Sequence, residues 1–341
     1  MSYISFQPHD YFNTVTYTGN GGNQTISTVG FQPDFVWFKS RDAGNSHAIV
    51  DSVLGTNKVL YADTSSPEQS ISSQTFNSNG YALVQDSGAN SINSNGSTKV
   101  AWNWKMGTTS GLSGGGITPS GYSISATAKQ SIIKFTGTGS AATLPHGLSS
   151  TPSAIIVKNA SVNNNWNVYH QSMGNTHRLF LDTTQAKEDN ASAWNDTSPT
   201  SSLFTVGTNT NVNQSGSTMV AYCFADNQGY FKAGTFKGNG NADGTYVHLG
   251  FRAGMVLMKN SETTDQWQIF DSKRGYNGAI GFSYPDSAEA ETASVPMDIL
   301  SQGIKFRDAS SARNDTGYDY IYMAWAEDPT VSSNGVAGVA R

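Results

Sequence analysis

The chain contains three copies of one pattern, and this repetition constrains its fold more than any single residue does. Each copy has an early aromatic residue followed by a Gly-x-Gly step, at YTGNG (17–21), FTGTG (135–139) and FKGNG (236–240). Each then has an apolar run that ends in a lysine, at DFVWFK (34–39), SAIIVK (153–158) and GMVLMK (254–259). Landmarks that recur in the same order, at intervals of about 100–120 residues, indicate one supersecondary unit copied in tandem.

Two further landmarks belong to the same repeat. Twelve residues after the lysine, the runs HAIVD, WNVYH and WQIFD end in Asp51, His170 and Asp271. Late in each copy an alanine precedes an aromatic residue inside an apolar stretch, at Ala101-Trp102, Ala221-Tyr222 and Ala324-Trp325. Three copies of a scaffold favour a function that depends on shape and surface over one that depends on a single catalytic pocket.

The local patterns predict a fold that is nearly all β. The apolar runs are short and rich in Val, Ile, Phe, Tyr and Trp, and six Asn-Gly pairs supply the positive φ angles of tight hairpins. Runs such as 35–38 and 255–258 are apolar without alternation, which is typical of strands covered on both faces. We therefore expect an all-β fold of three tandem, homologous, β-sandwich-like modules with almost no helix.

The landmarks also predict the boundaries. We expect an N-terminal arm, three β repeats and a small-residue tail, at 1–11, 12–106, 129–227, 228–328 and 329–341. Between the first two repeats, the segment 107–128 begins with GTTSGLSGGGITPSG. Because this composition cannot form a core, we expect a flexible Gly/Ser/Thr-rich linker unless a partner holds it.

Composition excludes several classes of function. The net charge of −5 and the pI near 5.6 argue against nucleic acid as a partner, since phosphate binding needs a basic surface. No apolar stretch reaches the roughly 18 residues of a membrane span. The single cysteine, Cys223, cannot form an internal disulfide, so stability has to come from packing.

The chain matches catalytic and metal-binding motifs only formally. GLSGG at 111–115 has the spacing of a nucleophile elbow but lies in the Gly/Ser-rich segment, and GTGSAA at 137–142 occupies a predicted hairpin. The six histidines are scattered, without the spacing of a metal site. Acid pairs such as Glu188 with Asp189 lie in polar loops. We therefore predict no catalytic residue, no metal and no cofactor.

Aromatic residues are the best candidates for contacts with a ligand or partner. Trp166 and Trp267 stand at equivalent positions, and His47 fills that position in repeat one. Either these side chains close the core of each module, or they are exposed at a sheet edge for stacking on a sugar or gripping a partner. The repeated lysines 39, 158 and 259 end apolar strands, where we expect their ammonium groups to reach solvent.

Several phrases also resemble a known family. They are FNTVTYTGNG (12–21), QPDFVWFKSRD (32–42), HAIVDSVLG (47–55), VAWNWK (100–105), WNVYH (166–170), VAYCFA (220–225), GTFKGNGNADG (234–244) and YIYMAWAEDP (320–329). In order and spacing they resemble a family of uncharacterised three-repeat proteins encoded in tailed bacteriophages and in environmental, largely aquatic, phage sequences. The resemblance covers nearly the whole chain. It departs at Leu54, where an arginine is expected, so an Arg–Asp contact with Asp51 would be lost.

The resemblance implies a virion-associated structural protein with no enzyme activity. We therefore expect a protein exposed on the particle surface, as a tail or head fibre or adaptor or as a capsid decoration. Its partners would be other virion proteins, through self-association or docking at a threefold or quasi-threefold site. Two alternatives stay open: an adhesin for host-surface glycan, with exposed aromatic residues on one repeat only, and a glycan depolymerase, with a cleft that holds two acids.

Overall fold

The computed structural model describes residues 6–71, 74–84, 92–275 and 278–328, so the expected tail at 329–341 and residues 1–5 of the arm lie outside it. Strands make up 43% of the structure and helices 4%, which confirms the all-β prediction. Within the described residues, no helix is long and apolar enough to cross a membrane. A short 3-10 helix, η1 (Pro8–Asp10), precedes the first strand.

Repeat one is built from two sheets. The larger has the order β1 (Phe12–Thr18), β9 (Thr98–Trp104), β3 (Phe35–Ser40), β4 (Ala48–Asp51), β5 (Lys58–Tyr61), β6 (Gln69–Ser70). The smaller has the order β2 (Gln24–Ile26), β8 (Gly80–Leu83), β7 (Gln74–Asn77). Every described pairing is antiparallel, as expected for strands joined by short turns.

Repeat two has the same plan, with one strand more in its larger sheet and one fewer in its smaller sheet. Its larger sheet has the order β10 (Gly121–Ser125), β11 (Gln130–Thr136), β18 (Thr218–Phe224), β13 (Ala154–Asn159), β14 (Asn167–His170), β15 (His177–Phe180), β16 (Glu188–Asp189). The smaller sheet pairs β12 (Ala142–Pro145) with β17 (Leu203–Val206). The short helices α1 (Ala191–Trp194) and α2 (Thr210–Asn213) complete this repeat.

Repeat three returns to six strands in the larger sheet. The order is β19 (Phe231–Lys237), β27 (Asp319–Asp328), β21 (Arg252–Asn260), β22 (Gln268–Asp271), β23 (Ile280–Ser283), β24 (Thr292–Ser294). Its smaller sheet is β20 (Tyr246–His248), β26 (Gly303–Phe306), β25 (Met297–Leu300). The three larger sheets therefore share one order in which the last long strand of each repeat lies between the first and the third.

The Gly-x-Gly step has a steric cause that is the same in each repeat. A Cβ on the first glycine, Gly19, would lie 2.3 Å from the carbonyl oxygen of Ser94, and Gly137 and Gly238 meet backbone oxygens at 2.2 and 2.1 Å. The second glycine has positive φ, at 69° in Gly21. The first position leaves no room for a Cβ, and the second needs the left-handed backbone that glycine adopts at the lowest cost, so both positions require glycine.

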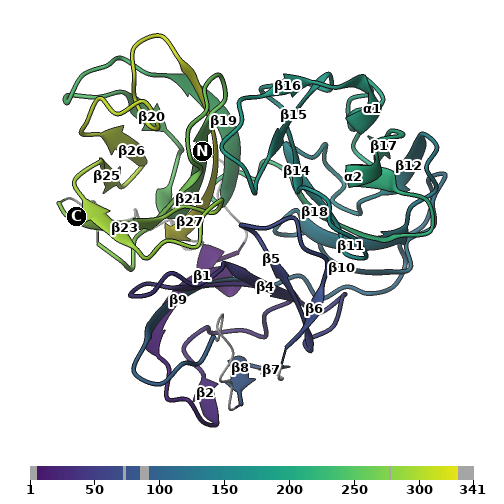
Figure 1. Cartoon of the computed structure of the whole chain (residues 1–341), viewed down its shortest axis with the longest axis horizontal. Coiled ribbons are helices and arrows are strands. Elements are labelled where there is room, and N and C mark those ends of the chain that lie inside the picture. Colours follow the sequence, from purple (N-terminus) through teal and green to yellow (C-terminus); the bar gives the residue numbers. More distant parts are fainter. Residues whose placement is uncertain (1–5, 72–73, 85–91, 276–277, 329–341) are drawn as a thin grey trace.

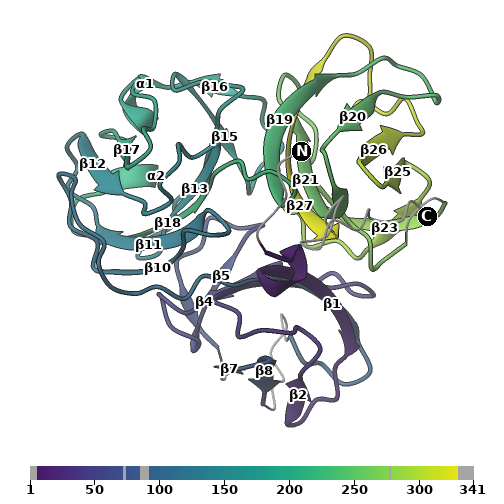
Figure 2. The ribbon, with the colours of Figure 1, turned by 180° about the vertical axis from the view of Figure 1, so that it is seen from behind.

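The third strand of each repeat, β3, β13 or β21, is buried on both faces of its larger sheet, as the apolar runs without alternation predicted. In β3, Val36 and Phe38 pack within repeat one, whereas Phe35 and Trp37 face a core shared by all three repeats. In β21, Met255 joins the same shared core. Figure 1 shows the resulting shape, three lobes around a common centre, and Figure 2 shows the same arrangement from behind.

The segment 107–128 is not the flexible linker that its composition suggests. Its strand β10 pairs with β11 along its whole length, and the backbone of Thr108 pairs with that of Ile124. The amides of Gly116 and Ile117 both donate to the carbonyl of Thr143, and the Ile117 side chain is buried in the core of repeat two. Repeat two therefore supplies the partner that holds this segment.

Candidate functional site

The best candidate site is the centre of the molecule, where the three larger sheets meet. Trp104, Phe224 and Trp325 occupy equivalent places beside β3, β13 and β21, respectively. The ring of Trp325 lies 5.4 Å from that of Trp104 and 5.2 Å from that of Phe224, both edge-on. Packing leaves a void of only about 10 Å³, so this centre is a core and not a ligand cavity.

The predicted contact residues belong to this core. Trp166 and Trp267 have 0% of their surface exposed, so the hypothesis of rings that stack on a sugar or grip another protein is wrong at these positions. Each indole instead joins its own repeat to the preceding one. Trp166 Nε1 donates to the carbonyl of Tyr61 at 2.9 Å, and Trp267 Nε1 donates to that of Phe180 at 2.7 Å.

His47 occupies the equivalent position in repeat one and is also fully buried, so it cannot serve as an exposed contact either. Its Nδ1 accepts a hydrogen bond from Trp37 Nε1 at 2.9 Å. Burial lowers its pKa well below the usual value, and the charges of Lys39 and Arg274 lower it further. The nearby backbone of Tyr284 in repeat three raises the pKa slightly in the opposite sense. Nε2 is buried, and no hydrogen bond of good geometry reaches it from the described residues. The imidazole is therefore neutral.

A second set of contacts uses the residues that end β4, β14 and β22. Tyr222 in repeat two donates its hydroxyl to Asp51 of repeat one at 2.7 Å. Trp102 in repeat one donates Nε1 to Asp271 of repeat three at 3.0 Å. In the ring, repeat three lies before repeat one. In both contacts the donor therefore belongs to one repeat and the acceptor to the repeat before it.

The third junction uses different residues to the same end. Met323 stands where the other repeats have Trp102 and Tyr222, so the expected equivalence of Trp325 with these two residues is wrong by two positions. A thioether cannot donate a hydrogen bond. The acceptor position holds His170 in place of aspartate, and its Nε2 lies 3.1 Å from the carbonyl oxygen of Tyr322 in repeat three. Because Nδ1 accepts from the amide of Ser172, Nε2 carries the proton and donates. Burial lowers the pKa of His170 to about 4, which keeps the ring neutral at pH 7.

Asp51 and Asp271 differ in their charge partners. Arg274 Nε lies 2.7 Å from Asp271 Oδ2, and both side chains are fully buried. The equivalent of Arg274 in repeat one is Leu54, so Asp51 has no such partner and is held by two amides and the Tyr222 hydroxyl. Burial raises the pKa of Asp51, and these three hydrogen bonds oppose the rise.

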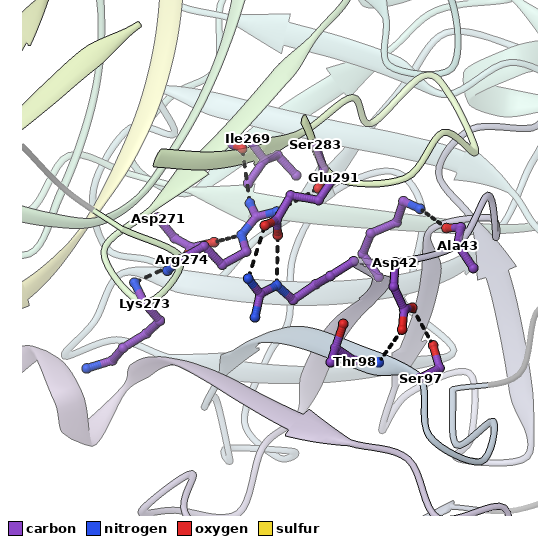
Figure 3. Close-up of polar contacts among 12 residues, drawn as sticks. Asp42, Ala43, Ser97, Thr98, Ile269, Asp271, Lys273, Arg274, Ser283 and Glu291 are labelled. Carbon is purple, nitrogen blue, oxygen red and sulfur yellow. Dashed lines mark hydrogen bonds and ion pairs between the residues drawn. The ribbon is translucent and has the colours of Figure 1, made fainter. Parts of the chain in front are cut away.

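The junction between the first and last repeats closes the ring, and Figure 3 shows its polar contacts. Arg41 of repeat one makes a bidentate contact with Glu291 of repeat three, at 2.8 and 3.0 Å. The amide of Glu291 also donates to the carbonyl of Arg41. Arg274 reaches Glu291 at 3.2 Å, and its guanidinium lies 5.1 Å from the ring centre of Trp102. Bidentate geometry makes the Arg41–Glu291 pair stronger than a salt bridge with a single contact.

The repeated lysines are buried, so the expectation of solvated ammonium groups is wrong. Lys158 Nζ donates to the carbonyls of Asn164, in its own repeat, and Ser65, in repeat one, at 2.5 and 2.7 Å. Lys39 Nζ donates to Ala288 of repeat three. Burial lowers the pKa of Lys39, Lys158 and Lys259 to about 8.

Three aspartates accompany these lysines. Asp63 and Asp182 accept the backbone amides of His47 and Trp166, and Asp286 is the equivalent residue of repeat three. Burial raises the pKa of all three, to about 6 in Asp182 and about 7 in Asp286, and the neighbouring aspartate adds to the rise in these two. In the described part of the chain, no group of three His, Cys, Asp or Glu side chains converges closely enough to hold a metal ion.

Comparison with known families places the chain in one of them. A family model described as a domain of unknown function, DUF7483, matches residues 7–329. The chain belongs to this family. Searches of curated proteins and of solved structures find no match. The match spans all three repeats of this chain.

The inter-repeat contacts could be located only in part from the sequence. The positions of Asp51, His170 and Asp271 are marked by the repeat, but nothing in the sequence says that they bond to another repeat. Arg41 and Glu291, 250 residues apart, carry no repeat signal at all. One junction did leave a signal in the sequence. Repeat three has Met323 where the other copies have a hydrogen-bond donor, and repeat two has His170 where the other copies have aspartate, so the two differences occur together.

Proposed function

We propose that this protein is a non-enzymatic structural component on the surface of a tailed bacteriophage particle. The observation that carries the proposal is the closed ring of three repeats, in which hydrogen bonds join each repeat to its two neighbours around one core. The likeness of the chain to three-repeat phage proteins supports the same conclusion.

The ring has the mechanical properties that such a role needs. Its first and last repeats are joined by the partly buried Arg41–Glu291 contact, so these two repeats cannot separate without breaking a bidentate ion pair. Its three lobes, each built on a sheet of the same strand order, surround a common centre (Figure 1). A body of this shape matches a threefold or quasi-threefold site on a capsid or tail, where three similar partners surround one position.

The location on the particle is part of the proposal and can be tested directly. Particles of the encoding phage should contain the chain in a fixed copy number by quantitative mass spectrometry. Cryo-electron microscopy should show three-lobed density on a threefold or quasi-threefold position, of the capsid for a decoration protein or of the tail or a fibre for an adaptor. Absence from purified particles, or turnover of host polysaccharide by the purified chain, would refute the proposal.

An adhesin for host-surface glycan is the second candidate, and one observation favours it. Tyr246 in β20 is 46% exposed, and the neighbouring Val247 is buried. The equivalent strands β2 and β12 carry Thr25 and Thr143 at this position, beside the buried Ile26 and Leu144. An exposed ring on one repeat only is what an adhesin requires. Loss of binding to host polysaccharide in Tyr246→Ala, with particle attachment unchanged, would support this candidate.

A further inference from the structure

A solvent-open pocket of about 540 Å³ lies between repeat one and the segment that leads into repeat two. One wall is formed by repeat one, at Gln32, Asp34, Ser52, Val53 and Lys105. The other wall is formed by the connecting segment and β10, at Gly107, Thr109, Gly121 and Tyr122. The pocket therefore depends on the part of the chain that breaks the threefold repetition, because β10 has no counterpart in the other larger sheets.

Asp34 is the group that builds this pocket. Its Oδ1 accepts the hydroxyls of Ser52 and Ser123, both at 2.9 Å, and its Oδ2 accepts the amide of Met106 at 2.9 Å. Ser123 lies on β10, so this buried carboxylate fixes the connecting segment against repeat one. The equivalent backbone positions hold Ser153 in repeat two and Gly254 in repeat three. An acid at this place is not needed to form the repeat.

The connecting segment is held at further points, which makes the pocket wall rigid. The hydroxyl of Tyr122 accepts the amide of Leu112 at 3.0 Å, and Thr108 pairs with Ile124 across the base. On the opposite side, Lys134 Nζ donates to the carbonyl of Val53 at 2.9 Å. A preformed polar pocket loses little conformational entropy when a ligand binds.

The groups that face the pocket indicate the class of ligand. Lys105 and Asp34 carry opposite charges, so the lining is close to neutral overall. The Lys105 ammonium lies over the Tyr11 ring at 5.7 Å and makes no hydrogen bond within the described residues. The exposed side chains of Gln32 and Thr109 add an amide and a hydroxyl, and a carboxylate with about four acceptor sites retains capacity at Asp34. A single cation and no helix N-terminus make a poor phosphate site.

We propose that this pocket binds one or two units of a neutral saccharide. The pocket is lined by hydrogen-bond donors and acceptors and by the half-buried ring of Tyr122. A sugar matches this lining, because its hydroxyl groups both donate and accept and its ring has an apolar face. The inference extends the proposed surface location, because only a chain exposed on the particle would meet such a glycan. It does not depend on Tyr246, which lies in repeat three.

The test uses the full chain and three neutral disaccharides, maltose, cellobiose and lactose, with glucuronate as a charged probe. Saturation-transfer NMR and calorimetric titration should show at least one disaccharide bound with a dissociation constant of about 1 mM or tighter, which corresponds to about −4 kcal/mol. Thr109→Trp should fill the pocket and weaken that binding at least tenfold. Ser113→Trp, an exposed change on the same segment outside the pocket lining, should leave it unchanged.

Several results would overturn the inference. Failure of all three disaccharides to bind at 10 mM would do so, as would equal binding by the Thr109→Trp and wild-type chains. Stronger binding of glucuronate than of every disaccharide would exclude a neutral ligand. Binding that is lost in Tyr246→Ala but kept in Thr109→Trp would move the site to repeat three. The location of the chain on the particle is measured separately, so a failed sugar titration leaves that proposal to its own test.

Discussion

Replacing Arg274 with leucine would test the central role of the closing junction, because it copies into repeat three the residue that repeat one has at Leu54. Arg274 is fully buried. Its guanidinium donates to Asp271, Ser283, Glu291 and the carbonyl of Ile269 at 2.7–3.2 Å. The change therefore removes a buried cation from beside the carboxylates of Asp271 and Glu291.

Removing one partner of a buried ion pair costs about 3–5 kcal/mol, since the other charge stays buried without compensation. The lower end applies here. Asp271 keeps the amides of Lys273 and Arg274 and the indole of Trp102, each at 3.0 Å, and Glu291 keeps Arg41. We therefore expect Arg274→Leu to lower the free energy of unfolding by about 3 kcal/mol.

Equilibrium unfolding in guanidinium chloride at pH 7, followed by tryptophan fluorescence, measures this difference. Lys273→Ala is the matched control, because Lys273 lies in the same turn but is 43% exposed in its pair with Glu327, so its loss should cost less than about 1 kcal/mol. Adding Asp271→Asn to Arg274→Leu should restore part of the loss by removing the stranded charge. A cost below about 1 kcal/mol for Arg274→Leu would refute the reasoning.

Three further predictions concern single sites. Tyr222→Phe should destabilise the fold by about 1.5–3 kcal/mol at pH 7 in urea unfolding, because it leaves the Asp51 carboxylate without the hydroxyl that donates to it. Burial raises the pKa of Asp51, so the cost should fall as the pH is lowered and this carboxylate takes up a proton. The pKa of Asp286, about 7, exceeds its unfolded value near 4, so its stabilising effect is full below pH 4 and is lost as the pH rises through 7. Asp286→Asn should therefore flatten the fall in melting temperature from pH 5 to 7.5, and an unchanged slope would contradict this. Gly19→Ala should cost about 1–3 kcal/mol by overpacking, whereas Gly22→Ala in the same hairpin, with its nearest atom at 3.8 Å, should be neutral in thermal unfolding.

Much of the fold could be predicted because its cause lies within each copy. The strand 35–38 is apolar at every position, which already says that both of its faces are covered. The Gly-x-Gly step is set by a close approach and a left-handed turn inside one hairpin. Local sterics and the two-residue period of a strand act over a few residues, so they are visible in the sequence.

The shared core is different, because its contacts join residues from different copies. The sequence of 35–38 shows that both faces are covered but not that one of them meets the other two repeats. The same reason explains the wrong predictions for Trp166, Trp267 and Lys158. The sequence of a strand end does not show whether solvent or the carbonyl of another repeat lies next to the side chain.

The amino-acid order alone determined three copies of one β unit, with their turns and with strands that need cover on both faces. Closure into a ring was decided only in three dimensions, where Arg41 meets Glu291 and Asp34 fixes the connecting segment to repeat one. The physical reason is range. Turn geometry and strand periodicity depend on neighbours in the chain, whereas these polar contacts depend on residues that the fold brings together from 89 and 250 positions apart.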